Sequence, residues 1–215
     1  TGAQMIEAVR AAKKDKDTVG GLVEAHVFNL PPGLGSCADW RDKLDARLAY
    51  AVMGIQAFKS VEIGMGVGVA DRRGSEVHDP IRFDPAMQDT PSLGFVRDTN
   101  HAGGLEGGMT NGEPVVVRAA MKPISTLLKG LPSVDLNTKT PEPSQYERSD
   151  VCAVPAASVV LEHVVAFEIA RAVLDKFAGD TMIELRAAYD AYLDTARALP
   201  LEPPTDVVAT EDGPE

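Results

Sequence analysis

The sequence predicts an α+β fold in which helices are sandwiched between β-sheets. Short segments with strand-like patterns are interspersed with helices along the 215 residues, and 44% of the residues are hydrophobic, which is typical of a globular chain. Two helices, residues 44–55 and 154–177, carry too many apolar side chains for a surface position. A helix that is apolar all round is expected to be buried on all sides, so we expect these two at the centre.

The first elements along the chain are a helix and a strand. Residues 5–14 are expected to form an amphipathic helix with lysines near its C-terminal end. Residues 22–30 then alternate in strand fashion, with Val23, Ala25 and Val27 on one face. This strand therefore has one face suited to a core.

The first of the two apolar helices follows a turn rich in proline and glycine. Asp39 is a candidate N-cap for it. Leu44, Leu48 and Val52 fall at positions i, i+4 and i+8, which places them on one face. The apolar, glycine-bearing residues 58–69 that come next are expected to form a strand.

A long polar stretch occupies the middle of the sequence. Residues 71–98 contain several prolines and arginines and show no periodicity, so we expect a surface loop or flap. Such a flap is expected to be mobile without ligand and to order over the site when ligands bind. Residues 114–121 are expected to form a strand, and residues 138–144 a polar connection.

The C-terminal third is mainly helical. Residues 154–177 form the longest expected helix, and Gly179 is its stop signal. A last helix is expected over residues 181–199, with Asp180 as its cap. Residues 201–215 carry five acidic and no basic side chains, and we expect a disordered acidic tail there.

Charge and cysteine content restrict the possible partners and compartment. The formal net charge of −11 argues against nucleic acid and against anionic membrane as partners. No apolar run approaches the ~18 residues that a transmembrane helix needs. Cys37 and Cys152 lie far apart and form no CxxC pair, so a reduced, cytoplasmic chain is the simplest interpretation.

The most unusual segment is residues 100–112, which we call the glycine loop. Its five glycines allow backbone to approach a ligand closely and to present N–H donors. The spacing matches neither GxGxxG nor GxxxxGK[ST], so dinucleotide-binding and P-loop interpretations fail. A mobile loop or a set of bulges is an equally good interpretation of the composition.

A candidate anion site follows ten residues later. Lys122, Ser125 and Thr126 offer a point charge and two hydroxyl donors on a proline-stiffened turn, although an ordinary exposed strand end is the simpler alternative. Arg148 can hold a phosphate or carboxylate through two hydrogen bonds. Asp150 nearby can be an N-cap instead of a functional group.

Other chemistry has little support in the sequence. Among the four histidines only His101, at the start of the glycine loop, is a candidate; His26 and His163 are expected to be structural. There is no HExxH, no GxSxG and no Cys/His cluster, so we expect no metal site. Cys152 is expected to be a small buried residue.

Taken together and in order, these segments resemble the chorismate synthase family. The residues that carry the resemblance are Gly33-Leu34-Gly35, Lys43-Leu44-Asp45-Ala46, Leu48-Ala49, Met53-Gly54-Ile55-Gln56-Ala57-Phe58-Lys59, Val61-Glu62-Ile63-Gly64, the glycine loop, Val117-Arg118-Ala119, Lys122 to Thr126, and Arg148-Ser149-Asp150-Val151-Cys152-Ala153-Val154-Pro155. No single motif suffices, but the ordered set is highly specific.

The resemblance implies a flavin-dependent elimination. The family converts 5-enolpyruvylshikimate 3-phosphate to chorismate and phosphate in the shikimate pathway of aromatic amino acid biosynthesis. The 1,4-anti elimination needs reduced FMN and involves no net redox change, and NADP is also associated with the family. The resemblance implies that electron-rich flavin helps phosphate leave, and that a base near flavin N5 completes removal of the C6 hydrogen.

The resemblance also implies site residues and an assembly. Asp150 would lie near flavin N5 and the substrate as a proton relay. The family fold is a β-α-β sandwich with central helices that assembles as a homotetramer. By family match, the FMN site would be lined by Gln56, Ala57, Gly107, Lys122, Pro123, Ile124, Ser125, Thr126 and Arg148.

Two departures from the family pattern leave an alternative open. The family's N-terminal half is absent, with its two acid histidines and several substrate-binding arginines, and residues 70–98 look divergent. We therefore expect residues 1–200 to be the C-terminal portion of a chorismate synthase-like domain. The alternative is a truncated, non-catalytic module that binds FMN or phosphate, or that only oligomerises.

Overall fold

The structure is a computed structural model that describes residues 2–198. The chain divides into two compact units, residues 1–176 and 177–215. The expected acidic tail, residues 201–215, lies outside the described residues. The α+β class is confirmed by the mixture of helices and antiparallel strands in the larger unit.

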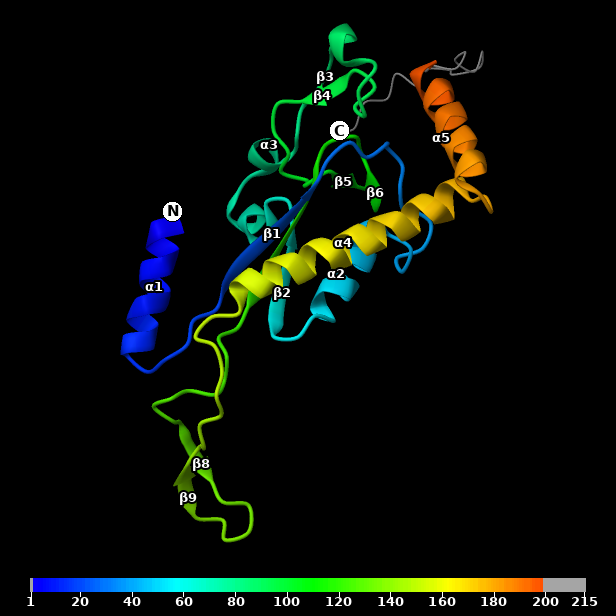
Figure 1. Ribbon diagram of the computed structural model, residues 1–215. Helices are drawn as coiled ribbons and strands as arrows, with labels where there is room; N and C mark the ends of the chain where they lie inside the picture. The colour runs from blue at the N-terminus through cyan, green and yellow to red at the C-terminus, as the bar shows by residue number, and fades with distance from the viewer. Residues whose placement is uncertain (1, 199–215) are drawn as a thin grey trace, which may run out of the picture. The chain divides into compact units, whose positions relative to one another are not determined.

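A three-stranded antiparallel sheet organises the larger unit (Figure 1). Strand β7 (Val115–Met121) lies in the middle and pairs with β1 (Gly21–Val27) on one side and β2 (Phe58–Ile63) on the other. The expected strands near residues 22–30 and 114–121 are thus confirmed. The strand expected over residues 58–69 is shorter, because a 3-10 helix, η1 (Gly66–Asp71), replaces its second half.

The two faces of this sheet differ in polarity. Val23, Val117 and Ala119 are buried on one face, as the alternation predicts. On the other face Arg118 lies between two glutamates on the flanking strands. Its guanidinium donates to Glu24 through Nε and to Glu62 through Nη1, so these charges are neutralised across all three strands.

Helix α2 (Leu44–Met53) buries the face that its spacing predicts. Leu44, Leu48 and Val52 are fully buried. The expected cap is wrong, because the N-cap position is Lys43 and no side chain caps the helix. The Asp39 carboxylate instead accepts hydrogen bonds from the backbone N–H and the guanidinium of Arg41.

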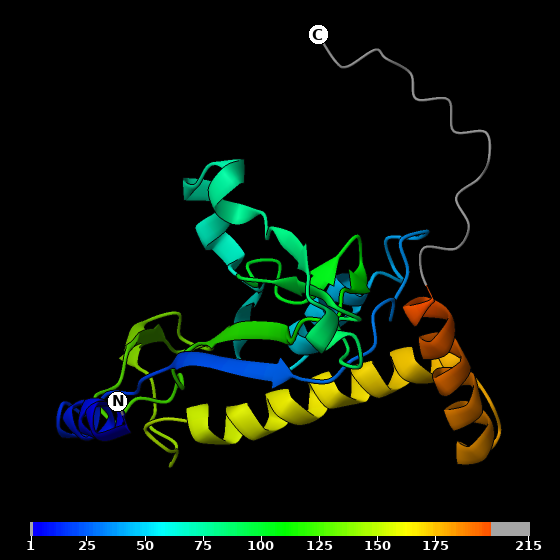
Figure 2. The same ribbon diagram turned by 90° about the horizontal axis from the view of Figure 1, so that it is seen from above.

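Helix α4 (Val154–Phe177) runs along the sheet, as Figures 1 and 2 show. Leu161, Val165 and Ile169 are buried at helical spacing, whereas Val159 and Phe167 are exposed, Phe167 by 66%. The expectation that this helix is buried on all sides is therefore not met among the described residues. The physical reason is that the sheet covers one face of α4, and no second sheet covers the other within residues 2–198.

An ion-pair cluster ties α2 to α4. Arg47 on α2 is largely buried, and its Nη1 donates to Asp175 at 2.8 Å. Its Nε lies 3.5 Å from the buried carboxylate of Glu168. Arg47 and Glu168 are shielded from water, whereas Asp175 is 66% exposed, so the cluster joins the two helices at a partly buried position.

The stretch expected to be a structureless flap contains short elements of its own. These are α3 (Gly74–Val77), β3 (Ile81–Phe83), η2 (Pro85–Met87) and β4 (Phe95–Arg97), and β3 pairs with β4. We call residues 71–98 the flap segment. The sequence pattern did not predict these elements, because each is only three or four residues long and so shows no periodicity.

The remaining elements of the larger unit are a helix and two small hairpins. Helix α1 (Gly2–Lys14) confirms the first expected helix. The strands β5 (Leu105–Glu106) and β6 (Met109–Thr110) form a hairpin within the glycine loop. The strands β8 (Pro132–Val134) and β9 (Pro141–Pro143) form another, where the sequence predicted only a polar connection.

The smaller unit contains helix α5 (Met182–Arg197). Its N-cap is Thr181 and not the expected Asp180, and Thr181 forms a reciprocal capping box with Glu184. The ring of Phe177 meets those of Tyr189 and Tyr192 edge to face. These aromatic contacts form the apolar centre of the unit.

The buried face of α2 allows a direct stability test. We expect Leu48→Ala to lower the free energy of unfolding by about 2–5 kcal/mol, because it removes fully buried methyl groups and leaves a cavity. Tyr50→Ala on the same helix is the control: that side chain is 86% exposed, and we expect a change within about 0.5 kcal/mol. Urea unfolding followed by circular dichroism measures both, and equal losses would contradict the assignment of the buried face.

Candidate functional site

Most of the expected site residues gather at one end of the central sheet. Residues 122–126 follow the last residue of β7, and Gln56 and Ala57 precede the first residue of β2. The backbone N–H of Lys122 donates to the carbonyl of Ala57 at 2.9 Å, which joins these two segments directly. Antiparallel pairing requires this juxtaposition, because the end of β7 lies beside the start of β2.

The segment that precedes α4 joins the same end of the sheet. The hydroxyl of Thr126 donates to Ser149 Oγ at 2.8 Å, so residues 148–150 lie against residues 122–126. The hydroxyl of Thr18, just before β1, donates to the carbonyl of Ile124 at 2.6 Å. Residues 122–126, which we call the anion-site turn, are thus held by hydrogen bonds to three separate segments, at Ala57, Thr18 and Ser149.

The polar side chains at this end are available to a ligand. Lys122, Ser125, Arg148 and Asp150 are exposed. Among the described residues, none bonds to the ammonium group of Lys122, the guanidinium of Arg148 or the carboxylate of Asp150. One ammonium, one guanidinium and the Ser125 hydroxyl provide charge and donors for a phosphate, whereas the hydroxyl of Thr126 already donates to Ser149.

The alternative role of Asp150 as an N-cap does not agree with the structure. Helix α4 begins at Val154, four residues farther along. The carbonyl of Ala153 accepts the first helical hydrogen bond, from Ala157, which places the cap position at Ala153. Asp150 therefore carries a free carboxylate beside the anion-site residues.

An apolar cavity of about 560 Å³ adjoins this polar cluster. Gln56 and Met121 line it from the sheet end, and Ala153, Ala157 and Val160 line it from α4. Its volume falls within the range of small-molecule sites. Apolar walls beside a cluster of anion-binding groups fit a ligand with a flat apolar body and an anionic end.

Gly107 lies apart from the other expected flavin contacts. It is in the β5–β6 hairpin, which comes before β7, whereas Lys122 comes after it. The seven residues of β7 span roughly 20 Å. The carbonyl of Gly108 accepts a hydrogen bond from the backbone N–H of Leu44, so the hairpin also lies at the start of α2. Gln56, in contrast, comes after the last residue of α2. The structure therefore does not bring Gly107 and the anion site together at one end of the sheet.

The conformation of the hairpin requires glycine whether or not a ligand binds. Gly107 and Gly108 have φ values of 60° and 88°, the geometry of a two-residue type I′ turn. A Cβ at Gly108 would come within 2.6 Å of the Ser36 carbonyl oxygen. A Cβ at Gly107 would meet nothing within 4 Å, so the space over this residue is open to a partner.

Sequence reasoning missed Asp79, a buried carboxylate that anchors the start of the glycine loop. Its side chain is fully buried and accepts from Thr99 Oγ1 at 2.5 Å and from the backbone N–H groups of His101 and Ala102 at 2.9 Å. Burial raises the pKa of this carboxyl, but the hydrogen bonds from Ala102, Thr99 and His101 outweigh burial and hold the pKa below its ordinary value. Its partners are distant in sequence, so no local pattern indicates it.

His101 and the cysteines have structural surroundings. His101 Nδ1 lies 3.0 Å from the carbonyl oxygen of Val77, a hydrogen bond that links the loop to α3. Cys37 and Cys152 are both free thiols, and Cys152 is half-buried. Within residues 2–198 no cluster of three or more His, Cys, Asp or Glu side chains could hold a metal ion. No helix in the same range is long and apolar enough to cross a membrane.

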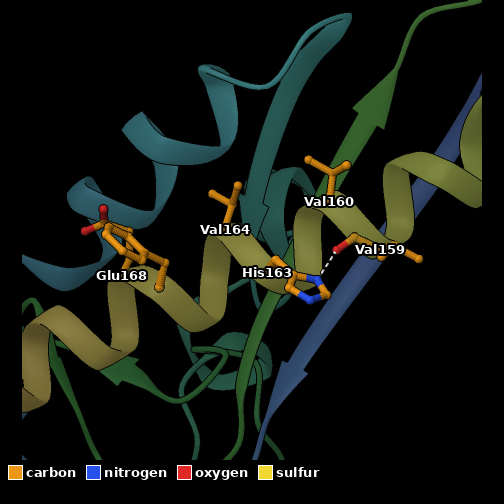
Figure 3. Close-up of a pocket in the computed structure, with 6 residues that line it drawn as sticks. Val159, Val160, His163, Val164 and Glu168 are labelled. Atoms are coloured by element: carbon orange, nitrogen blue, oxygen red, sulfur yellow. Dashed lines mark hydrogen bonds between the residues drawn. The ribbon is translucent and has the colours of Figure 1, made fainter.

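The exposed face of α4 forms a second apolar surface. Val159, Val160, Val164 and Phe167 line a shallow cavity of about 470 Å³, shown in Figure 3. His163 Nδ1 lies 2.8 Å from the carbonyl oxygen of Val159, four residues earlier in the helix. His163 is exposed, and that contact gives its ring a partner within its own helix.

Comparison with known proteins identifies one family. The sequence model of the chorismate synthase family matches residues 1–174. The chain is 57% identical over 197 residues to a chorismate synthase from Geobacter metallireducens, covering 91% of this chain and 50% of that protein. It is 60% identical over 178 residues to one from Trichlorobacter lovleyi, covering 82% of this chain and 45% of the relative.

A solved structure gives the same result. A crystal structure of a chorismate synthase superposes with a TM-score of 0.74 at 38% identity, covering 91% of this chain and 49% of the other. The chain spans about half the length of the curated relatives it matches.

The depressed pKa of Asp79 predicts a pH-dependent contribution to stability. Because the folded-state pKa lies below the unfolded one, the contribution is present above the unfolded pKa of about 3.9 and is lost as pH falls through the folded pKa. We expect Asp79→Asn to cost about 1–3 kcal/mol at pH 7 and less below pH ~4.

Urea unfolding at a series of pH values tests this expectation. Asp98→Asn is the control, because Asp98 is an exposed aspartate whose ion-pair partner, Arg82, is also exposed. We expect it to change stability by no more than about 0.5 kcal/mol at any pH. A cost of Asp79→Asn that stays constant with pH would contradict the assignment.

Proposed function

Because this chain belongs to the chorismate synthase family, we propose that it serves the 1,4-anti elimination of phosphate from 5-enolpyruvylshikimate 3-phosphate, which yields chorismate with the help of reduced FMN. The observation that carries the proposal is the cluster of exposed, unpaired Lys122, Arg148 and Asp150 beside an apolar cavity. Both FMN and the substrate have a phosphate for the cationic groups to hold and an apolar or ring-shaped body.

The residues at the end of the sheet fit FMN in chemistry. Lys122, Ser125 and Thr126 would bind the phosphate, with Pro123 and Ile124 shaping the turn that presents them. Gln56 lines the adjoining apolar cavity, and Ala57 follows it in the chain as the second expected flavin contact from that segment. Reduced FMN, when bound, would supply electron density that assists departure of the substrate phosphate.

One cationic and one acidic group complete the proposed site: Arg148 would line the FMN site, and Asp150 would serve the proton. Arg148 can hold a phosphate oxygen pair bidentately, because its guanidinium makes no bond to the described residues. Asp150, two residues away, has a free carboxylate that can accept or relay a proton beside the bound ring. Gly107 remains an expected flavin contact from the resemblance alone, because it lies at the other end of β7.

The wider setting of the reaction belongs to the same proposal. We propose a phosphate-lyase activity in the cytoplasm, in a homotetramer, with NADP as an associated nucleotide. The net charge of −11 supports partners other than nucleic acid or an anionic membrane surface. A small cationic cluster on an otherwise acidic chain supports recognition of compact anions over polyanions.

A second candidate function is favoured by the outward face of α4. Val159, Val160 and Phe167 are exposed and apolar, and a helix that presents such a face to water usually packs against another protein surface. The chain by itself would then be a binding or oligomerising module without activity. Flavin binding without turnover would support this second function for the chain alone.

The anion site predicts a loss of flavin affinity on removal of one charge. We expect Lys122→Ala to weaken FMN binding roughly tenfold or more, because a charge-assisted hydrogen bond contributes about 1.5–3 kcal/mol. Lys14→Ala on α1 is the control, since Lys14 is equally exposed but remote in sequence from every expected site residue. Fluorescence titration with FMN gives both affinities, and an unchanged value in folded Lys122→Ala would exclude the assignment.

The chain alone should have little or no chorismate synthase activity. By the resemblance, the acid histidines and several substrate arginines of the family belong to the part that this chain does not match, and loss of a well-placed acid or base typically costs about 10²–10⁴-fold. The measurement is chorismate formation under anaerobic conditions with chemically reduced FMN. The full-length Geobacter metallireducens relative provides the reference rate, and comparable turnover would show that Asp150 and its neighbours suffice.

A further inference from the structure

A short segment between α1 and β1, residues 16–20, lies at the same end of the sheet as the candidate anion site (Figure 1). We call it the brace segment. The Thr18 hydroxyl donates to the carbonyl of Ile124 in the anion-site turn at 2.6 Å. The next residue, Val19, donates through its backbone N–H to the carbonyl of Val151 at 2.9 Å, in the segment that precedes α4. The brace segment therefore joins the anion-site turn to the segment that precedes α4.

The contact between the brace segment and the anion-site turn extends to both ends of the turn. A Cβ at Gly20 would collide with the carbonyl oxygen of Met121, so only glycine allows the two backbones to approach this closely. Beyond the turn, Lys129 donates through its backbone N–H to the carbonyl of Lys16 and through its ammonium to Asp17. The turn is thus bounded on both sides by contacts with the same segment.

The hydrogen bonds that hold the turn use its carbonyl groups and leave its backbone donors unused. The carbonyl of Ile124 accepts from Thr18. The carbonyl of Thr126 accepts from Ser149. Among the described residues, none accepts a hydrogen bond from the backbone N–H groups of Ile124, Ser125 and Thr126. Successive free N–H groups at a bend of the chain form an anion-binding concavity, so the turn is held without loss of the donors that a phosphate needs.

Thr18 has a special place among these contacts. From the described part of the chain, its hydroxyl makes the only hydrogen bond to residues 123–125. Pro123 has no N–H to donate, and no described group bonds to the Ser125 hydroxyl. Thr18 and Ile124 are 106 residues apart, so this bond is not part of a local turn. Loss of one hydroxyl would free the middle of the turn and leave a carbonyl without a protein donor.

We propose that Thr18 is a positioning residue for the ligand phosphate. Its hydrogen bond holds the anion-site turn in the conformation that presents the free N–H groups and the Lys122 ammonium to the anion. The proposal takes FMN as the ligand and so rests on the proposed function, whereas the contacts of the turn are those of the structure. A turn that is held before the ligand arrives need not be ordered on binding, so Thr18 raises affinity without touching the ligand.

The decisive variant removes the hydroxyl and keeps the shape of the side chain. Thr18→Val does this, and Thr18→Ser restores the hydroxyl without the methyl group. Thr195→Val on α5 is the matched control, because the Thr195 hydroxyl also donates to a backbone carbonyl, that of Ala191 at 2.9 Å, in the smaller unit. Fluorescence titration gives the FMN affinity. The amide NMR signals of residues 124–126 are followed during titration with FMN and, separately, with inorganic phosphate.

In the unaltered chain we expect both ligands to shift the amide signals of residues 124–126. We expect Thr18→Val to weaken FMN binding about tenfold, because the turn must then be ordered when the ligand binds. Thr18→Ser should restore the affinity to within about twofold, and Thr195→Val should leave it unchanged. The amide signals of β7 should be the same in ligand-free Thr18→Val as in the unaltered chain, which separates loss of positioning from loss of the sheet.

Other outcomes overturn the proposal. These are an unchanged affinity in Thr18→Val, an equal loss in Thr18→Ser or Thr195→Val, or amides of residues 124–126 that neither ligand shifts in the unaltered chain. If phosphate shifts these amides but FMN does not, the proposed function fails, and the phosphate affinity of Thr18→Val alone decides the role of Thr18. If Thr18→Val does not fold, Thr18→Ala replaces it with the same expected loss.

Discussion

The pairing of β7 between β1 and β2 is the constraint on which the rest of the structure depends. A central strand has both edges occupied, so its two ends are fixed with respect to both neighbours. The glycine loop enters β7 at one end, and the anion-site turn leaves it at the other. Every other candidate residue is placed by its relation to one of these two ends.

Each end of β7 is held by a different kind of interaction. At the candidate anion site the contacts are backbone and hydroxyl hydrogen bonds, such as those of Thr126 with Ser149, and the charged side chains of Lys122 and Arg148 make no bond to residues 2–198. At the glycine loop the charged groups themselves are engaged, with Asp79 and Arg97 bonded to the loop. Free charges suit ligand capture, whereas engaged charges suit positioning, so the two ends are equipped for different tasks.

The outer face of α4 is consistent with a chain that spans about half the length of its relatives. The inner face of the helix packs as helical periodicity requires, with Leu161, Val165 and Ile169 buried. Its outer face carries Val159, Val160 and Phe167, which are 53%, 45% and 66% exposed in the described structure. The sequence of α4 has apolar side chains on both faces, but the described residues cover only the inner face. This is why the sequence pattern predicted a helix buried on all sides.

The sequence by itself determined the α+β class, the central strands and the choice of residues for the candidate anion site. Alternation at Val23 and Ala25, helical spacing at Leu44 and Leu48, and the turn that begins at Lys122 are local patterns, and local patterns are read directly from residue order. Only the tertiary structure decided that Gly107 lies away from Lys122, and that Asp79 and Arg97 hold the glycine loop. The physical reason is that these relations join residues through strand pairing and buried charge, and neither has a signature in neighbouring residues.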